Sequence, residues 1–96
     1  MEIKDIYELK TRFDSRKSFY GKAYIIVCDN GNRYLRSYST IVAAVINNKC
    51  YCNGLYSQTT TRHIKEFFRQ ETGDILNIKQ LKELPFIPDN SYNFSL

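Results

Sequence analysis

Short turns divide the middle of the chain into stretches whose residues favour β-strands. Residues 22–28 are rich in β-branched and aromatic side chains, and they end at the sequence Asp-Asn-Gly-Asn over 29–32. An Asn-Gly pair tolerates the positive φ angles of a hairpin turn. Residues 33–38 then have the composition of the partner strand. We therefore expect a β-hairpin over 22–38.

The chain then turns back twice more. Ser39-Thr40 can bend it into 41–46, an unbroken apolar run of the kind found in a strand that is covered on both faces. Asn47-Asn48 is a second tight turn and leads into 49–53. Strands joined by connections this short pair antiparallel. Residues 22–53 thus predict a four-stranded antiparallel meander.

The best helix of the chain follows the last of these strands. Hydroxyl side chains from Ser57 onward can accept hydrogen bonds from the free backbone N–H groups of a first helical turn. Apolar residues then recur at spacings of three and four, as on a helix face that packs against a core: Ile64, Phe67 and Phe68. Gly73 stands where a helix C-cap belongs. We expect this helix over 59–72.

The N-terminal segment also has a helical pattern. Asp5 with Glu8 three residues later matches a capping box, and apolar residues continue at helical spacing to Phe13. These features predict a short amphipathic helix over 5–16.

The C-terminal segment is less regular. Residues 78–84 predict a short helix, after which Pro85 and Pro88 exclude regular structure. The extended tail over 85–96 either packs back as an edge or stays mobile as a peptide able to dock elsewhere. Together the segments predict a single α+β domain over 1–96, with an N-terminal helix, a four-stranded antiparallel meander, a main helix and an irregular tail.

Charge is unevenly spread along the 96 residues. Residues 1–70 hold twelve Lys or Arg and six Asp or Glu, whereas 71–96 hold two and four. A basic body with a mildly acidic tail favours an anionic partner, either nucleic acid or an acidic protein face.

Cysteine usage favours a reducing compartment. The chain has three cysteines, an odd number, and Cys50 and Cys52 are two residues apart, a spacing that does not favour a disulfide within a strand. A C-x-C pair in a chain with one histidine lacks the further ligands of a zinc site, so we expect no metal and no cofactor. The charged N-terminus and the short apolar runs predict a cytoplasmic protein without a signal peptide or membrane span.

The sequence contains no recognisable catalytic constellation. The one histidine, His63, has no serine or cysteine near it in a known nucleophile motif, and no phosphate-binding loop is present. We expect His63 to be a packing or hydrogen-bonding residue of the fold, and not a base or a ligand. The chain is therefore predicted not to be an enzyme.

The first hairpin offers one candidate binding face. With uninterrupted alternation, one face holds Ala23, Ile25, Val27 and Leu35, and the opposite face holds Lys22, Tyr24, Tyr34, Arg36 and Tyr38. Cations between aromatic rings on an open sheet can hold single-stranded nucleic acid. The alternative is an ordinary solvated sheet face covered by tyrosine rings, and a one-residue bulge would rearrange either face.

The main helix offers a second candidate. Arg62, Lys65 and Arg69 recur on the side opposite the apolar stripe, where they could follow a phosphate backbone or an acidic protein groove. The alternative is a solvated helix face on which Glu66 balances part of the charge.

Two segments resemble a known family when taken together. The segment Ser-Tyr-Ser-Thr-Ile-Val-Ala over 37–43 fits the pattern S-Y-x-T-x-V-A, and 56–67 fits Y-S-x-T-T-x-x-H-I-x-x-F. This pair is similar to small uncharacterised domains encoded by phages, plasmids and other mobile elements of Gram-positive bacteria. The resemblance spans about residues 33 to 70 and implies a structural role for the motif, in which Ser, Thr and His organise a strand-to-helix corner. It transfers no functional residue.

The resemblance also implies a functional hypothesis. Some anti-CRISPR proteins look similar to this domain. We therefore expect an inhibitor that binds a Cas effector stoichiometrically and blocks its DNA or guide engagement, with Cas9 as the favoured effector. Its partner would be the nuclease itself or its guide RNA. The alternative is a nucleic-acid-binding accessory or regulatory domain of a mobile element, acting through the sheet face or the helix stripe. The sequence leaves the partner and the oligomeric state open.

Overall fold

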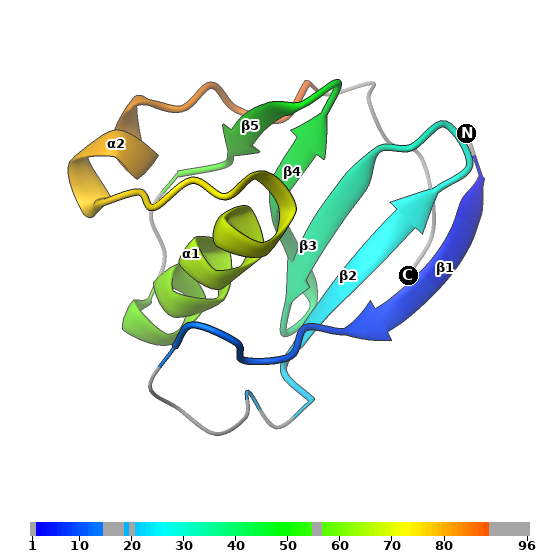
Figure 1. Cartoon of the computed structure of the whole chain (residues 1–96), viewed down its shortest axis with the longest axis horizontal. Helices are drawn as coiled ribbons and strands as arrows, with labels where there is room; N and C mark the ends of the chain where they lie inside the picture. Colours follow the sequence, from blue (N-terminus) through cyan, green and yellow to red (C-terminus); the bar gives the residue numbers. More distant parts are fainter. Residues whose placement is uncertain (1, 15–18, 20, 55–56, 89–96) are drawn as a thin grey trace.

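The computed structural model describes residues 2–14, 19, 21–54 and 57–88. These residues form an antiparallel sheet with a long helix against one face (Figure 1). The strands lie in the sheet in chain order, and each pairs antiparallel with the next: β1 (Ile3–Glu8), β2 (Ala23–Cys28), β3 (Arg33–Ser37), β4 (Thr40–Ile46) and β5 (Lys49–Cys52). The helices are α1 (Gln58–Thr72) and α2 (Ile78–Glu83). The α+β class is confirmed.

The predicted N-terminal helix over 5–16 is wrong, and the sheet has five strands instead of four. Residues 3–8 form β1, an edge strand that pairs with β2. The apolar pattern that predicted a helix does not face a core, since Ile6 is 46% exposed and Phe13 is 52% exposed, whereas Leu9 is buried. Pairing with the open edge of β2 therefore outweighs the local capping pattern, because the sheet satisfies backbone groups of β1 that a short helix would leave free.

The meander from β2 to β5 occupies the predicted segment, and its turns lie where the sequence places them. Gly31, Asn47 and Asn48 all have positive φ angles of 90°, 52° and 65°, as tight hairpin turns require. One irregularity interrupts the alternation of β4. Leu35 pairs with Ala43 while Arg36 pairs with Ile41, which leaves Val42 as a bulge.

The two faces of the sheet contribute to two apolar clusters. The bulge lets both Val42 and Ala43 join the larger cluster between the sheet and α1, where Phe67 and Phe68 of the helix are fully buried. The opposite face carries the smaller cluster, which consists of Ile26, Cys28, Tyr34, Ile41, Ala44 and Ile87.

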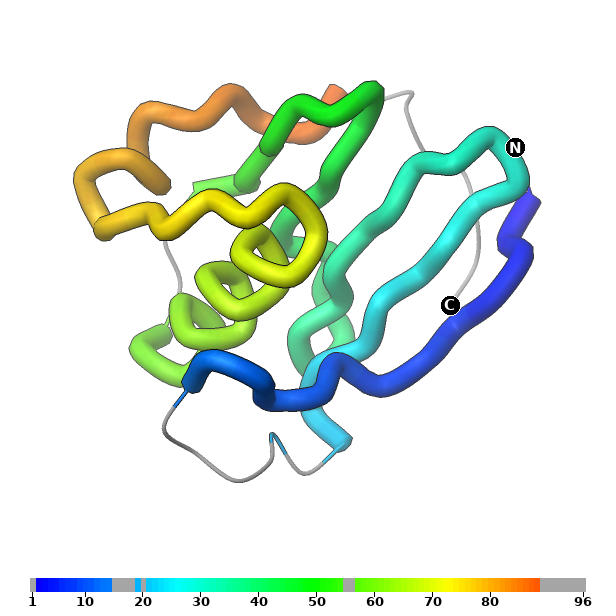
Figure 2. The backbone as a smooth tube through the Cα atoms, viewed as in Figure 1, coloured from blue at the N-terminus to red at the C-terminus, as the bar shows by residue number. Residues whose placement is uncertain are grey.

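Helix α1 has the caps that the sequence predicts. The Ser57 hydroxyl accepts a hydrogen bond from the backbone N–H of Thr60, and Gly73 takes the left-handed conformation, with its N–H donating to the carbonyl of Arg69. Figure 2 shows α1 running past the segment that follows β1. This contact between residues far apart in sequence builds the candidate site described below.

The C-terminal segment returns to the last strand. The carbonyl of Pro85 accepts a hydrogen bond from the backbone N–H of Cys52, and the N–H of Ile87 donates to the Asn53 side chain. Residues 85–88 of the predicted tail therefore pack back beside β5, while 89–96 lie outside the described residues.

Candidate functional site

A buried polar cluster joins β3 to the start of α1. The hydroxyl of Ser37 lies 2.8 Å from Nδ1 of His63 and 2.9 Å from Oγ1 of Thr60. The ring of Phe19 meets the His63 imidazole edge-on at 4.5 Å between centroids. All three polar side chains are buried. The Ser–His pair has the spacing of a nucleophile and its base, but its burial gives it a structural role at the strand-to-helix corner.

A second buried polar residue on α1 holds the segment that follows β1. Oε1 of Glu66 accepts hydrogen bonds from the backbone N–H groups of Phe13 at 3.0 Å and Asp14 at 2.8 Å. The Gln70 amide bridges the other Glu66 oxygen and the carbonyl of Lys10. Because these bonds satisfy the carboxylate, Glu66 can be buried as an acceptor. Residues 10–14 are thereby fixed along α1.

The predicted helix stripe flanks this fixed segment. Nη1 of Arg62 lies 3.0 Å from a carboxylate oxygen of Asp14, and the Arg69 guanidinium lies 4.1 Å from the centroid of the Phe13 ring. Lys65, which lies between these two arginines in the sequence, is exposed. The structure therefore brings the three predicted cations together with residues that the sequence had placed in a separate helix.

In the ion pairs of the described residues, the cation is always the more exposed partner. The exposed side-chain fractions are 34% and 12% for Arg62–Asp14, 38% and 14% for Arg33–Glu71, and 74% and 27% for Lys10–Glu8. Glu66, on the same helix as Arg62, is also buried. In each of these ion pairs the carboxylate thus lies deeper than its cation, so the side of α1 next to residues 10–14 shows mainly the cations Arg62, Lys65 and Arg69.

A groove of about 200 Å³ lies within this surface. Its lining combines cations with exposed apolar side chains and consists of Phe13, Asp14, Arg62, Lys65, Glu66, Arg69, Ile75 and Leu76. The groove thus offers an aromatic ring and positive charge side by side.

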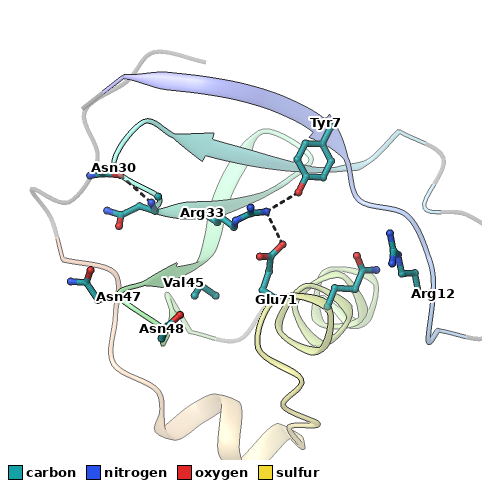
Figure 3. A pocket seen from close by; sticks show the side chains of 11 residues that line it. Tyr7, Arg12, Asn30, Arg33, Val45, Asn47, Asn48 and Glu71 are labelled. Atoms are coloured by element: carbon teal, nitrogen blue, oxygen red, sulfur yellow. Dashed lines mark hydrogen bonds and ion pairs between the residues drawn. The ribbon is translucent and has the colours of Figure 1, made fainter.

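A larger and more polar pocket, of about 540 Å³, lies at the neighbouring end of the sheet (Figure 3). The β2–β3 and β4–β5 turns meet the last residues of α1 there, and the lining consists of Tyr7, Arg12, Asn30, Gly31, Asn32, Arg33, Val45, Asn47, Asn48, Gln70 and Glu71. Nη1 of Arg33 lies 3.0 Å from the Tyr7 hydroxyl and 3.3 Å from Oε1 of Glu71. Arg12 lies on the α1 side of the pocket, away from Asn47 and Asn48 (Figure 3).

The predicted sheet face does not form one continuous surface. The Arg36 guanidinium lies 4.8 Å from the ring centroid of Tyr24, whereas Tyr34 is fully buried in the smaller apolar cluster. Lys22 instead lies 5.9 Å from the ring centroid of Tyr38, and that ring lies 6.1 Å from the imidazole of His63 on the helix side. The five predicted residues therefore divide into two cation–aromatic pairs and one core residue.

Sequence reasoning missed the polar pocket. A usable signal was present, because alternate turns of an antiparallel meander lie at the same end of the sheet. That rule brings the Asn-Gly turn and the Asn-Asn turn together. Tyr7 and Arg12 could not be added to the site, since both lay in the predicted N-terminal helix.

Cys28, Cys50 and Cys52 are free thiols. Burial raises the pKa of the Cys28, Cys50 and Cys52 thiols above its ordinary value. In the described part of the chain, no group of three His, Cys, Asp or Glu side chains is placed to hold a metal ion. Neither of the described helices is long and apolar enough to cross a membrane.

Comparison with known proteins assigns the chain to a family. Residues 7–83 match the model of DUF8033, a family of unknown function. The chain belongs to this family. All lining residues of the groove and of the polar pocket fall within the span that matches DUF8033. No match is found among curated proteins, and none among solved structures.

Proposed function

We propose that the protein binds nucleic acid through a basic surface made by five cations: Lys10, Arg12, Arg62, Lys65 and Arg69. The observation that carries the proposal is the outward position of the cations, with Asp14 and Glu66 held beneath them. Exposed positive charge over buried negative charge attracts an anionic polymer, and the release of counterions from that polymer favours binding.

The groove favours nucleic acid over an acidic protein face. Phe13 is half exposed, and Arg69 lies against its ring. An aromatic ring beside several cations can stack a base while the cations contact phosphates. The protein then acts as a binding protein and not as an enzyme, and single-stranded nucleic acid is the partner that this combination suits.

The resemblance to mobile-element domains gives the proposal a more specific form. We propose that the chain is an anti-CRISPR-type inhibitor that binds a Cas effector such as Cas9 stoichiometrically. The basic surface would contact the guide RNA held by the nuclease, and the bound protein would block DNA or guide engagement. The alternative is an accessory or regulatory protein of a mobile element that binds DNA or RNA directly. This role requires the basic surface but no Cas effector.

The salt dependence of binding tests the basic surface. Arg12 and Lys65 are exposed, and neither side chain forms an ion pair with a described residue, so their replacement leaves the contacts of Arg62 and Arg69 intact. Fluorescence anisotropy with a labelled single-stranded oligonucleotide should give a log–log salt slope that falls by roughly 1 to 2 in the Arg12→Gln/Lys65→Gln variant, because each phosphate contact contributes about 0.7 to 0.9.

A matched control removes two exposed cations from another part of the chain. Lys79→Gln/Lys82→Gln on α2 changes the net charge by the same amount. It should leave the slope close to that of the wild type. Equal slopes for both double variants, or no binding of any oligonucleotide, would contradict the proposal.

A cleavage assay separates the two forms of the proposal. Under the inhibitor form, an equimolar amount of protein should reduce DNA cleavage by a guide-loaded Cas9, and Arg12→Gln/Lys65→Gln should inhibit less. If several Cas9 orthologues cleave DNA undiminished when this protein is in excess, the Cas9 form of the proposal is excluded. Direct nucleic-acid binding would then be the remaining form.

A further inference from the structure

Carboxamide side chains are the most frequent kind in the lining of the polar pocket. Asn30, Asn32, Asn47, Asn48 and Gln70 all line it. Asn30 and Gln70 are used within the fold, since Asn30 accepts from the backbone of residue 32 and Gln70 bridges residues 10 and 66. No hydrogen bond joins the exposed side chain of Asn47 or Asn48 to another residue that the structure describes. These two carboxamides can therefore offer both donors and acceptors to a ligand.

The two arginines of the pocket differ in how they are held. Arg33 is fixed by the Tyr7 hydroxyl and Glu71, which orient its guanidinium while part of it remains exposed. Arg12 is exposed and has no carboxylate partner among the described residues. Among the described residues of the lining, Glu71 is the only acidic one beside the two arginines, so this lining has a net positive charge.

Size and position restrict the ligand further. A volume of about 540 Å³ lies within the range of small-molecule sites, which is about 300 to 1,000 Å³. The pocket borders the basic surface through Arg12, and the neighbouring Phe13 lines the groove. A strand that follows the basic surface would therefore continue towards the pocket.

We propose that this pocket binds one nucleotide, with its phosphate facing Arg33 and Arg12 and its base edge facing Asn47 and Asn48. Asparagine carboxamides form paired hydrogen bonds with base edges, and guanidinium groups pair with phosphate. The nucleotide is a unit of a single strand, a step that rests on the proposed nucleic-acid binding. The pocket would then supply base preference, while the basic surface supplies affinity that does not depend on sequence.

Glycine substitutions test the pocket without straining the fold. Asn47 and Asn48 have φ angles of 52° and 65°, a conformation that glycine adopts without steric cost. Asn47→Gly/Asn48→Gly therefore removes both carboxamides and keeps the turn. Ser39→Gly is the matched control, because Ser39 is exposed in the β3–β4 turn at the opposite end of the sheet.

Binding of homopolymeric oligonucleotides of A, C, G and U measures the preference. The wild type and Ser39→Gly should favour one base by roughly tenfold, the scale of one paired base contact. Asn47→Gly/Asn48→Gly should lose that preference and keep the salt slope. A wild type without preference, or a preference that survives in the variant, would overturn the pocket proposal while leaving the basic surface in place.

Free nucleoside monophosphates distinguish the pocket from the strand. In ¹H–¹⁵N spectra, the favoured monophosphate at millimolar concentration should shift the side-chain amide signals of Asn47 and Asn48. Such shifts without any oligonucleotide binding would support the nucleotide pocket and overturn the proposed function. The absence of shifts with both monophosphates and oligonucleotides would overturn the pocket.

Discussion

Oγ of Ser37 lies 2.8 Å from Nδ1 of His63, and this hydrogen bond joins the end of β3 to the first turns of α1. The same hydroxyl meets Oγ1 of Thr60, and the Ser57 cap completes the corner. The helix start is thus set by side chains and not only by packing of its apolar stripe. This geometry gives a physical reason for the Ser, Thr and His positions that form the sequence motif.

Removal of the shared hydroxyl should destabilise the fold. Ser37→Ala deletes the group that contacts both Thr60 and His63 in a buried environment, and we expect a loss of about 1 to 3 kcal/mol in the free energy of unfolding. Urea denaturation followed by circular dichroism measures it. Ser39→Ala, in an exposed turn, should change stability by less than about 0.5 kcal/mol. Equal stability of the two variants would contradict a structural role for the cluster.

Replacement of the buried carboxylate should release the segment that follows β1. Glu66→Gln places an amide donor where one of two acceptor oxygens stood, so either the Phe13 and Asp14 amides or the Gln70 amide loses its acceptor. We expect a loss of about 2 kcal/mol in the free energy of unfolding, since hydrogen bonds to charged groups contribute roughly 1.5 to 3 kcal/mol.

Hydrogen exchange identifies the site of this loss. The backbone amides of Phe13 and Asp14 should exchange faster in Glu66→Gln than in the wild type. The amides of the central strands should keep the same rank order of exchange rates in both proteins. Glu83→Gln, an exposed position on α2, serves as the control. Unchanged exchange at residues 13 and 14 would exclude the anchoring role of Glu66.

Local signals predicted the meander and the main helix because those signals agree with the tertiary fold. The Asn-Gly and Asn-Asn turns, the Ser57 cap and Gly73 each act within a few residues of their own position. The N-terminal segment shows the opposite case, in which a capping pattern at Asp5 was overridden by pairing with β2. Such pairing depends on an edge formed elsewhere in the chain, and local pattern does not encode it.

The candidate site was only partly predictable for the same reason. The stripe of Arg62, Lys65 and Arg69 follows from helical spacing alone, and the structure places it on the outer side of α1. Its partners in the segment 10–14 come from a contact between α1 and residues that are far away in the sequence. The bulge at Val42 likewise arises from strand pairing and moves β4 side chains between faces.

Gly73 should tolerate asparagine better than alanine. Its φ angle is 80°, and an added Cβ would meet no atom within 4 Å, so the cost of substitution is conformational and not steric. We expect Gly73→Ala to lower the free energy of unfolding by about 1 kcal/mol and Gly73→Asn to lower it by less, because asparagine visits the left-handed region more readily. Thermal melts of both variants measure the difference. Alanine as stable as glycine would contradict the left-handed cap.

The cysteine thiols should react slowly in the folded protein. Burial raises the pKa of the Cys50 and Cys52 thiols, which lowers the thiolate fraction at neutral pH. Cys50 is half-buried whereas Cys52 is buried, so iodoacetamide should modify Cys50 first, as peptide mass spectrometry can show. Modification of Cys52 at the rate of Cys50 under native conditions would contradict the described packing.

The same shift predicts how stability depends on pH. A thiol whose pKa is higher in the folded state than in the unfolded state contributes its full stabilisation below the unfolded value, which is about 8.5. That contribution is lost as the pH rises through the folded value. The free energy of unfolding should therefore fall above about pH 8.5. In Cys52→Ala it should fall less steeply than in the wild type, because one thiol with a raised pKa is absent. Urea denaturation at intervals from pH 7 to 10 measures both slopes, and parallel slopes would show that burial of Cys52 does not couple to its ionisation.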